Sequence, residues 1–240
     1  MAVVKSLRAE KGVNYMENIN STSEYQKVID YIYKKIQDDI LTVGSKLPTE
    51  RSISEELGIG RNSTREALSI LDGMGMIERI QGSGNYISKN AGRSIKQIIM
   101  MMMALGTITR KEVCDFRRTM EKSVCMMLIE KDISCAQKEK FMSLLKDMEN
   151  ADRSKIAYYD KKFHDELIIS TENVLFITIM EAVVEVYRDW IDIVLNKADE
   201  KSRAKFLQYH IEIFNGIIDK NMVLMVEAID KHYDLIETMI

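Results

Sequence analysis

The order of short elements between residues 24 and 88 constrains the fold of this chain more than any other feature. Apolar residues at helical spacing predict a first helix from Glu24 to about Val43; they are Val28, Ile29, Ile32, Ile36 and Ile40. Thr49, which follows the only proline of the chain, is a good N-cap for a short second helix that Gly58 closes. Two helices therefore follow one another with only a short connection.

A third helix is predicted from about Arg61 to Met74, a few residues after the second, with Ala67, Leu68 and Leu71 on its inner stripe. Two short helices so close together are typical of a helix-turn-helix. The next segment, MIERIQGSGNYIS, alternates apolar and polar residues around a Gly-Ser-Gly tip, which predicts a β-hairpin, or wing. Residues 23–90 are therefore interpreted as a winged helix-turn-helix domain.

The second half of the chain carries helical patterns only. From Ser94 onward we find no strand signal and expect six or seven amphipathic helices. Two of their starts are marked by capping-box spacing, at Thr109 with Glu112 and at Ser134 with Gln137. A single proline in 240 residues also argues against a β-sandwich or barrel with many turns. The predicted fold class is mainly α, with the N-terminal winged helix-turn-helix followed by a C-terminal all-α helical bundle.

The same patterns divide the rest of the chain. Residues 1–22 lack periodicity and are rich in Asn and Ser, so we expect a flexible N-terminal extension. Residues 91–108 are expected to form a linker helix whose apolar face includes Met100 to Met103. Residues 109–240 are expected to form a helical domain.

Charge and hydropathy restrict the functional classes. The chain has 34 Lys and Arg against 37 Asp and Glu, so the whole molecule offers no general attraction to phosphate and nucleic-acid binding needs a locally basic surface. No run of 18 apolar residues predicts a membrane span, and the N-terminal residues lack the apolar core of a secretory signal. We therefore expect a cytoplasmic protein without a membrane partner.

The third helix has the division of faces that a recognition helix requires. Arg61, Asn62 and Arg65 lie at its N-terminal end, where the helix dipole also favours phosphate, while the opposite stripe is apolar. Other candidates for DNA contacts are Arg51 on the preceding helix and Gln81 and Gly82 at the wing tip. The alternative is that these arginines are solvated surface charges that pair with acidic neighbours.

The stretch LPTERSISEELGIGRNSTREALSILDGMGMIERIQGSGNYI resembles the winged helix of GntR-type bacterial transcription regulators. The resemblance implies a homodimer that reads a pseudo-palindromic double-stranded DNA operator. It also implies that Arg51, Arg61, Arg65 and Gly82 occupy the DNA-contacting positions of the family. One departure is Gly60, where the family usually has Ser or Thr; glycine can cap the helix but offers no hydroxyl to a phosphate.

All three histidines lie in the helical half. Asp160 and His164 are four residues apart and share one helical face, and His210 and His232 lie on the inner stripes of two later helices that we expect to be antiparallel neighbours. A single inward histidine is usually a hydrogen-bonded core residue. An Asp and three imidazoles buried together are costly unless they satisfy one another, and a divalent cation such as Zn²⁺ or Ni²⁺ would do so.

The second half resembles the FadR-type C-terminal ligand-binding (FCD) domain of the same regulators. The motifs that carry this resemblance are DFRRTME at 115–121, DKKFH at 160–164, STEN at 170–173, His210 and His232. It implies a metal held by Asp160, His164, His210 and His232, most simply Zn²⁺ with Ni²⁺ or Mn²⁺ as alternatives. It also implies that residues 109–240 form an effector-binding and dimerisation domain and that the effector is a small organic acid.

Arg117 and Asn173 are the candidate effector-binding residues. Arg117 lies on an inward stripe of its helix and is either a bidentate clamp for an effector carboxylate or the intrahelical partner of Glu121. Two other functions are compatible with the same residues. The first is a metal-dependent enzyme that acts on a small carboxylate, because a His and carboxylate site with open positions can activate water. The second is a regulator whose metal is purely structural.

Overall fold

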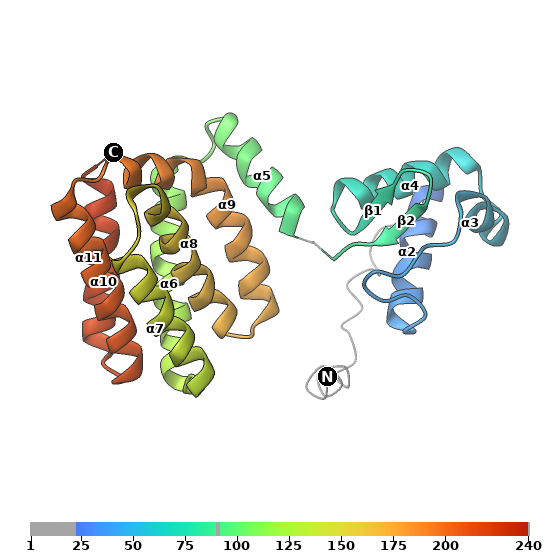
Figure 1. The fold of residues 1–240 in the computed structure, drawn as a ribbon. Helices are drawn as coiled ribbons and strands as arrows, with labels where there is room; N and C mark the ends of the chain where they lie inside the picture. Colours follow the sequence, from blue (N-terminus) through green and yellow to red (C-terminus); the bar gives the residue numbers. More distant parts are fainter. Residues whose placement is uncertain (1–22, 90–91, 240) are drawn as a thin grey trace. The chain divides into compact units, whose positions relative to one another are not determined.

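A computed structural model describes residues 23–89 and 92–239 (Figure 1). The predicted extension over residues 1–22 lies outside the described residues. The chain divides into two compact units, Met1–Lys89 and Asn90–Ile240. The described residues are mostly helical with one small sheet, which confirms the predicted fold class.

The first unit contains the predicted winged helix-turn-helix. Its elements are α2 Glu24–Gln37, α3 Glu50–Leu57, α4 Arg61–Gly73, β1 Ile77–Ile80 and β2 Gly84–Ile87. The Thr49 side chain caps α3 by accepting from the Ser52 N–H, and Gly58 ends that helix in the left-handed conformation, as predicted. The helices and the hairpin share one apolar core, which includes Val28, Ile53, Leu68, Ile77 and Ile87.

The prediction for the end of the first helix was wrong. Helix α2 ends at Gln37, because Asp39 takes a left-handed backbone conformation (φ 58°). The Ile40 N–H then bonds back to the Lys35 carbonyl, in the pattern of a Schellman cap. Ile40 is consequently 62% exposed and does not belong to the inner stripe, whereas Leu41 turns into the core.

Strands β1 and β2 form an antiparallel hairpin in which Ile77 pairs with Ile87 and Ile80 pairs with Gly84. Ile77 and Ile87 are buried, while Ile80 near the tip is half exposed. The connecting turn contains Gly82 in a left-handed conformation (φ 74°), which glycine adopts without steric cost. A wing is thus present where the sequence predicts it.

The second unit is a helical bundle without a described strand. Its helices are α5 Gly92–Ala104, α6 Arg110–Lys131, α7 Cys135–Glu149, the short 3₁₀ helix η2 Arg153–Lys155, α8 Ile156–Ser170, α9 Val174–Lys197, α10 Glu200–Ile218 and α11 Met222–Glu237. Both predicted capping boxes are present, at Thr109 with Glu112 and at Ser134 with Gln137.

Helix α5, predicted as a linker helix, packs against α9 inside the second unit. Of its four consecutive methionines, Met103 packs against the bundle core. Met100, Met101 and Met102 are exposed, so the predicted apolar face of this helix is only partly covered within the described chain.

Helices α10 and α11 are close neighbours joined by a short turn, as predicted from the positions of His210 and His232 (Figure 1). Gly216 permits their close approach, because a Cβ atom at this position would lie 2.7 Å from Met225 Cβ and 2.9 Å from its backbone nitrogen. No larger side chain fits there without a shift of α11.

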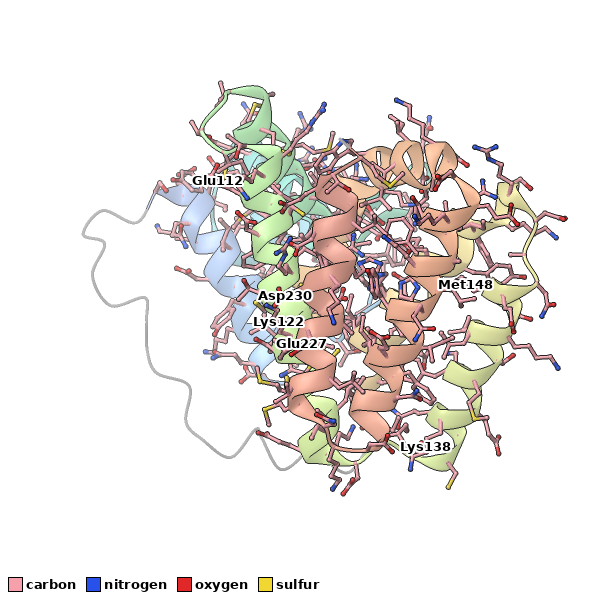
Figure 2. All side chains as sticks on the ribbon, turned by 90° about the vertical axis from the view of Figure 1, so that its left-hand side faces the viewer. Glu112, Lys122, Lys138, Met148, Glu227 and Asp230 are labelled. Atoms are coloured by element: carbon pink, nitrogen blue, oxygen red, sulfur yellow. The ribbon has the colours of Figure 1, made fainter. Side chains whose placement is uncertain are left out.

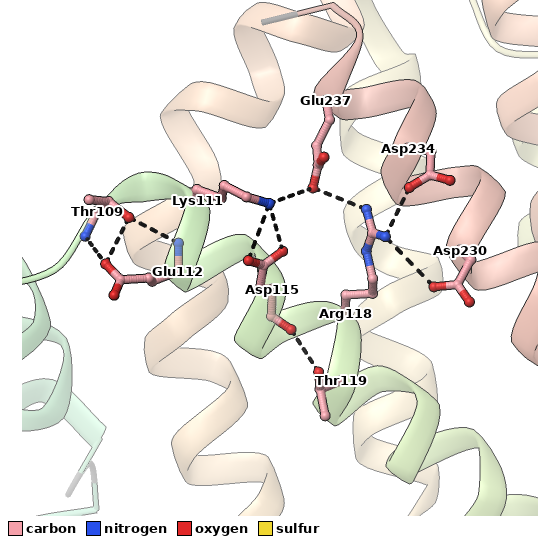
Figure 3. Close-up of polar contacts among 9 residues, drawn as sticks. All are labelled: Thr109, Lys111, Glu112, Asp115, Arg118, Thr119, Asp230, Asp234 and Glu237. Carbon is pink, nitrogen blue, oxygen red and sulfur yellow. Dashed lines mark hydrogen bonds and ion pairs between the residues drawn. The ribbon is translucent and has the colours of Figure 1, made fainter.

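A polar network fastens α11 to α6 on the outside of the bundle (Figure 3). Arg118 lies 2.9 Å from Asp234 Oδ1 and 3.0 Å from Glu237 Oε1. Lys122 and Asp230 form a further ion pair across the same two helices, and both are labelled in Figure 2. This network keeps the buried faces of α6 and α11 in register behind it.

Candidate functional site

Four buried side chains from three helices converge inside the second unit. Asp160 and His164 lie one turn apart on α8, His210 comes from α10, and His232 comes from α11. None is more than 3% exposed. Their possible ligand atoms all lie within 4.8 Å of one another. The structure therefore brings together the whole set that the sequence singles out.

The distances show how closely the four groups face each other. His210 Nε2 lies 3.3 Å from His164 Nε2 and 3.4 Å from Asp160 Oδ1. Asp160 Oδ1 also lies 3.7 Å from the Nε2 atoms of His164 and His232. Nitrogen and oxygen ligands of a tetrahedral Zn²⁺ with bonds of about 2.0–2.2 Å are separated by about 3.3–3.6 Å.

The cluster also contains buried polar atoms without partners. Asp160 Oδ1 and His232 Nε2 are fully covered and accept or donate no hydrogen bond among the described residues. Such atoms are rare in proteins because each carries a desolvation cost of a few kcal/mol. The residues thus fit a divalent cation, which would satisfy both orphaned atoms and suits imidazole and carboxylate ligands.

Glu121 supports the cluster from α6. Its Oε2 lies 2.8 Å from His164 Nδ1, on the ring edge opposite the converging Nε2, and it accepts a 3.0 Å hydrogen bond from the Tyr233 hydroxyl. Carboxylates in this position orient metal-ligating histidines. The sequence interpretation missed this role and treated Glu121 only as a partner of Arg117. The sequence feature that could have indicated this role is the position of Glu121 four residues after Arg117, on an inward stripe of the same helix.

The charges of the cluster follow from burial and mutual contact. Burial disfavours protonated His164, but Glu121 and Asp160 outweigh it and raise the His164 pKa to about 9. Burial raises the pKa of Glu121, yet His164 and Arg117 lower it to about 2. For His232 burial dominates and lowers the pKa to about 4. In the metal-free cluster the His164 imidazole therefore carries a second proton and a positive charge, and a cation can bind this ring only after that proton is lost.

Arg117, the first effector candidate, is 4% exposed, and its guanidinium carbon lies 5.7 Å from the ring centres of both Tyr187 and Tyr233. Its Nε has no hydrogen-bond partner among the described residues. Burial opposes its charge, but Tyr233, Glu121 and Asp160 hold its pKa above the ordinary value. Arg117 is thus a buried cation beside the cluster, and no ion pair joins it to Glu121 in the described chain.

Asn173, the second effector candidate, lies at the start of α9. Its side-chain oxygen accepts from the backbone N–H groups of Leu175 and Phe176 at 3.1 and 3.3 Å. The oxygen of Asn173 is therefore engaged as the N-cap of this helix.

The candidate DNA-binding residues lie on the first unit. Arg61, Asn62 and Arg65 are exposed at the N-terminal end of α4, while Ala67, Leu68 and Leu71 on the same helix are buried. Gln81 and Gly82 are exposed at the wing tip. The division of α4 into an exposed polar end and a buried apolar face is the one expected for a recognition helix.

Two of these arginines have acidic neighbours. Arg51 Nε lies 2.7 Å from Glu55 Oε1, and Arg65 Nη2 lies 3.3 Å from Glu50 Oε2. Because such exposed pairs contribute only about 0–1 kcal/mol, exchange of a carboxylate for a DNA phosphate costs little.

Gly60 precedes α4 as its N-cap and provides no side-chain hydrogen bond. The Glu24 carboxylate lies beside it, where it accepts a 2.6 Å hydrogen bond from Ser63. The hydrogen bonds of Ser63 and the Gly60 backbone lower the pKa of Glu24. A carboxylate thus contacts the end of α4 at which a phosphate is expected to bind.

Both halves of the chain match known protein families. Residues 24–87 match the family described as "Bacterial regulatory proteins, gntR family", and residues 112–235 match the FCD domain. The chain therefore belongs to the GntR family of bacterial transcription regulators, in the group that carries an FCD domain.

Curated relatives match along most of the chain. The HTH-type regulator YcbG of Bacillus subtilis is 24% identical over 86% of this chain and 85% of its own length. LutR of the same organism is 26% identical over 85% and 95%, and the Glc operon transcriptional activator of Escherichia coli is 21% identical over 80% and 79%. A solved structure, Streptococcus agalactiae GntR, has the same fold, with a TM-score of 0.69 and 24% identity over 89% of this chain and 99% of its own.

Within the described part of the chain, no helix is long and apolar enough to cross a membrane.

Proposed function

We propose that this regulator binds a divalent metal through Asp160, His164, His210 and His232 and changes its operator affinity when a small organic acid joins that centre. The observation that carries the proposal is the convergence of four buried ligand atoms within 4.8 Å, two of them without partners. Zn²⁺ is the proposed metal, and Ni²⁺ and Mn²⁺ are the alternatives to be tested.

The charges around the centre favour an anionic effector. With a divalent cation bound, the carboxylates of Asp160 and Glu121 balance its charge, and the buried guanidinium of Arg117 remains uncompensated. A carboxylate is the ligand that supplies this charge and can bind both a metal and a guanidinium. Arg117 is therefore proposed to orient the acid, while Glu121 holds His164 in place. Asn173 is proposed as a weaker contact of the effector.

On the DNA side, we propose a homodimer that reads a pseudo-palindromic operator with two copies of α4. Arg61, Asn62 and Arg65 would contact base edges and phosphates in the major groove, with Arg51 on the backbone. Gln81 and Gly82 at the wing tip would contact the backbone or the minor groove. Effector binding would then shift the dimer between arrangements that fit and miss the half-sites.

The direct test measures operator affinity of metal-free protein, metal-loaded protein, and each form with a panel of small organic acids. We expect an acid to change the affinity of the metal-loaded form and to leave the metal-free form unchanged. A purely structural metal would instead give a metal-free protein whose remaining folded fraction still responds to the acid. Catalysis predicts a third result, turnover of an acid that His210→Ala abolishes; the match to a family of transcription regulators favours regulation.

A further inference from the structure

A cavity of about 300 Å³ leads from one end of the bundle to the candidate metal centre. Asp160 and His210 form its inner end. Its walls are largely apolar and come from the start of α8, the end of α9 and the first half of α10; Ile156, Leu195, Phe206 and Leu207 are examples. Met148, which Figure 2 labels, lies at the end of α7 and adds to the same wall.

Arg203 lines this cavity from the first turns of α10. It is half-buried, and its Nε donates a 3.1 Å hydrogen bond to the Ala198 carbonyl at the end of α9. That bond fixes one edge of the guanidinium. Among the described residues no carboxylate forms an ion pair with Arg203, so the other edge remains available for the planar, two-oxygen contact that arginine makes with carboxylates.

We propose that this cavity binds an organic acid with a carboxylate at each end of a short apolar chain. One carboxylate would join the metal at Asp160 and His210, the apolar chain would contact Phe206 and its neighbours, and the second carboxylate would bind Arg203. This inference rests on the proposed function and specifies its effector class. The modest volume favours a ligand at the small end of the usual range.

Two further groups bear on the distal end of the ligand. Glu149 and Glu200 also line the cavity, and both are exposed. Water screens them more than the half-buried Arg203, so the guanidinium dominates the recognition of the distal group. If the glutamates dominated instead, the preferred ligand would carry an ammonium group at that end.

The test compares chain-matched acids that differ only in the distal group. Metal-loaded protein is titrated calorimetrically with glutarate, valerate and 5-aminovalerate, and then with the succinate and adipate homologues for length. The variant is Arg203→Gln, which removes the charge and retains a donor. Lys205→Gln is the matched control, because Lys205 is exposed on the same helix and does not line the cavity. Metal content and melting temperature are measured for both variants.

We expect a dicarboxylate to bind roughly tenfold or more tightly than its monocarboxylate counterpart, and we expect Arg203→Gln alone to remove this preference. Three results would overturn the inference while leaving acid binding at the metal in place. They are equal binding of glutarate, valerate and 5-aminovalerate, tightest binding of 5-aminovalerate, and a preference for the dicarboxylate that survives in Arg203→Gln. If no acid binds metal-loaded protein at all, the proposed effector function fails together with the inference.

Discussion

The two units use their charged residues in opposite ways. In the first unit the functional candidates Arg51, Arg61 and Arg65 are exposed. In the second unit Asp160 and the histidines are almost completely buried. Exposed charges cost little to keep and are free to exchange partners, whereas buried charges must be satisfied inside the fold. Substitutions in α4 should therefore change binding alone, while substitutions in the bundle centre should change both metal binding and stability.

The largest expected effect concerns removal of the metal. If free metal is at one hundred times its dissociation constant, binding stabilises the folded chain by about 2.7 kcal/mol, which corresponds to roughly 5–10 °C in melting temperature for a protein of this size. Chelation should therefore lower the melting temperature of the wild type, measured calorimetrically. His232→Ala, the control, should melt at the same temperature with and without chelator. An equal response of both proteins would place the stabilising ion elsewhere.

The next effect tests the support of the centre from α6. Glu121→Gln removes the carboxylate next to His164 Nδ1 and should weaken metal affinity about 10- to 100-fold, as loss of such outer contacts commonly does. Affinity is measured by competition with a fluorescent chelator. Glu130→Gln serves as control, since Glu130 lies on the same helix and is exposed. Unchanged affinity in Glu121→Gln would reduce Glu121 to a packing residue.

In the first unit, substitution of the exposed arginines of α4 should change DNA binding and not stability. Arg61→Ala or Arg65→Ala should weaken specific operator binding by about 1–3 kcal/mol if each side chain reads a base, with thermal stability nearly unchanged. The comparison variant is Lys34→Ala, which removes one exposed positive charge from α2. Operator affinity at fixed salt is the measurement, and wild-type affinity in both arginine variants would contradict the assignment of α4 as recognition helix.

The smallest expected effect concerns Gly60 at the start of α4. In Gly60→Ser the new Cβ meets Glu24 and Ser63 only at ordinary contact distances of 3.7 and 3.8 Å. The added hydroxyl should stabilise the first unit by a few tenths of a kcal/mol through capping. It should also strengthen operator binding by offering a donor to a phosphate. Urea denaturation and operator titration measure the two effects, and weaker operator binding would show that the hydroxyl does not replace the missing family contact.

Much of the fold was predictable because its signals are local. Helical periodicity, the Thr49 cap and the Gly-Ser-Gly tip each specify an element from a few neighbouring residues. The end of α2 was not predictable in this way, because apolar Ile40 continues the helical pattern while the backbone of Asp39 breaks it. Periodicity records which residues are apolar and does not record where the chain turns.

The candidate metal centre was also only partly predictable from local signals. The inward faces of α8, α10 and α11 could be read from spacing, and so the ligand set was found. The supporting role of Glu121 and the cavity beside Arg203 depend on which helices pack together, since α6 reaches His164 and the end of α9 anchors Arg203 only in the folded bundle. Such contacts between distant segments leave no local signal.

The proposed metal centre is tested most directly by the metal content of protein purified without chelator, measured by elemental mass spectrometry. We expect close to one divalent metal per chain in the wild type and loss of that metal in both His210→Ala and His232→Ala. Wild-type protein that takes up no metal after incubation with zinc, nickel and manganese would contradict this expectation, and the three histidines would then be core residues or direct contacts of an effector.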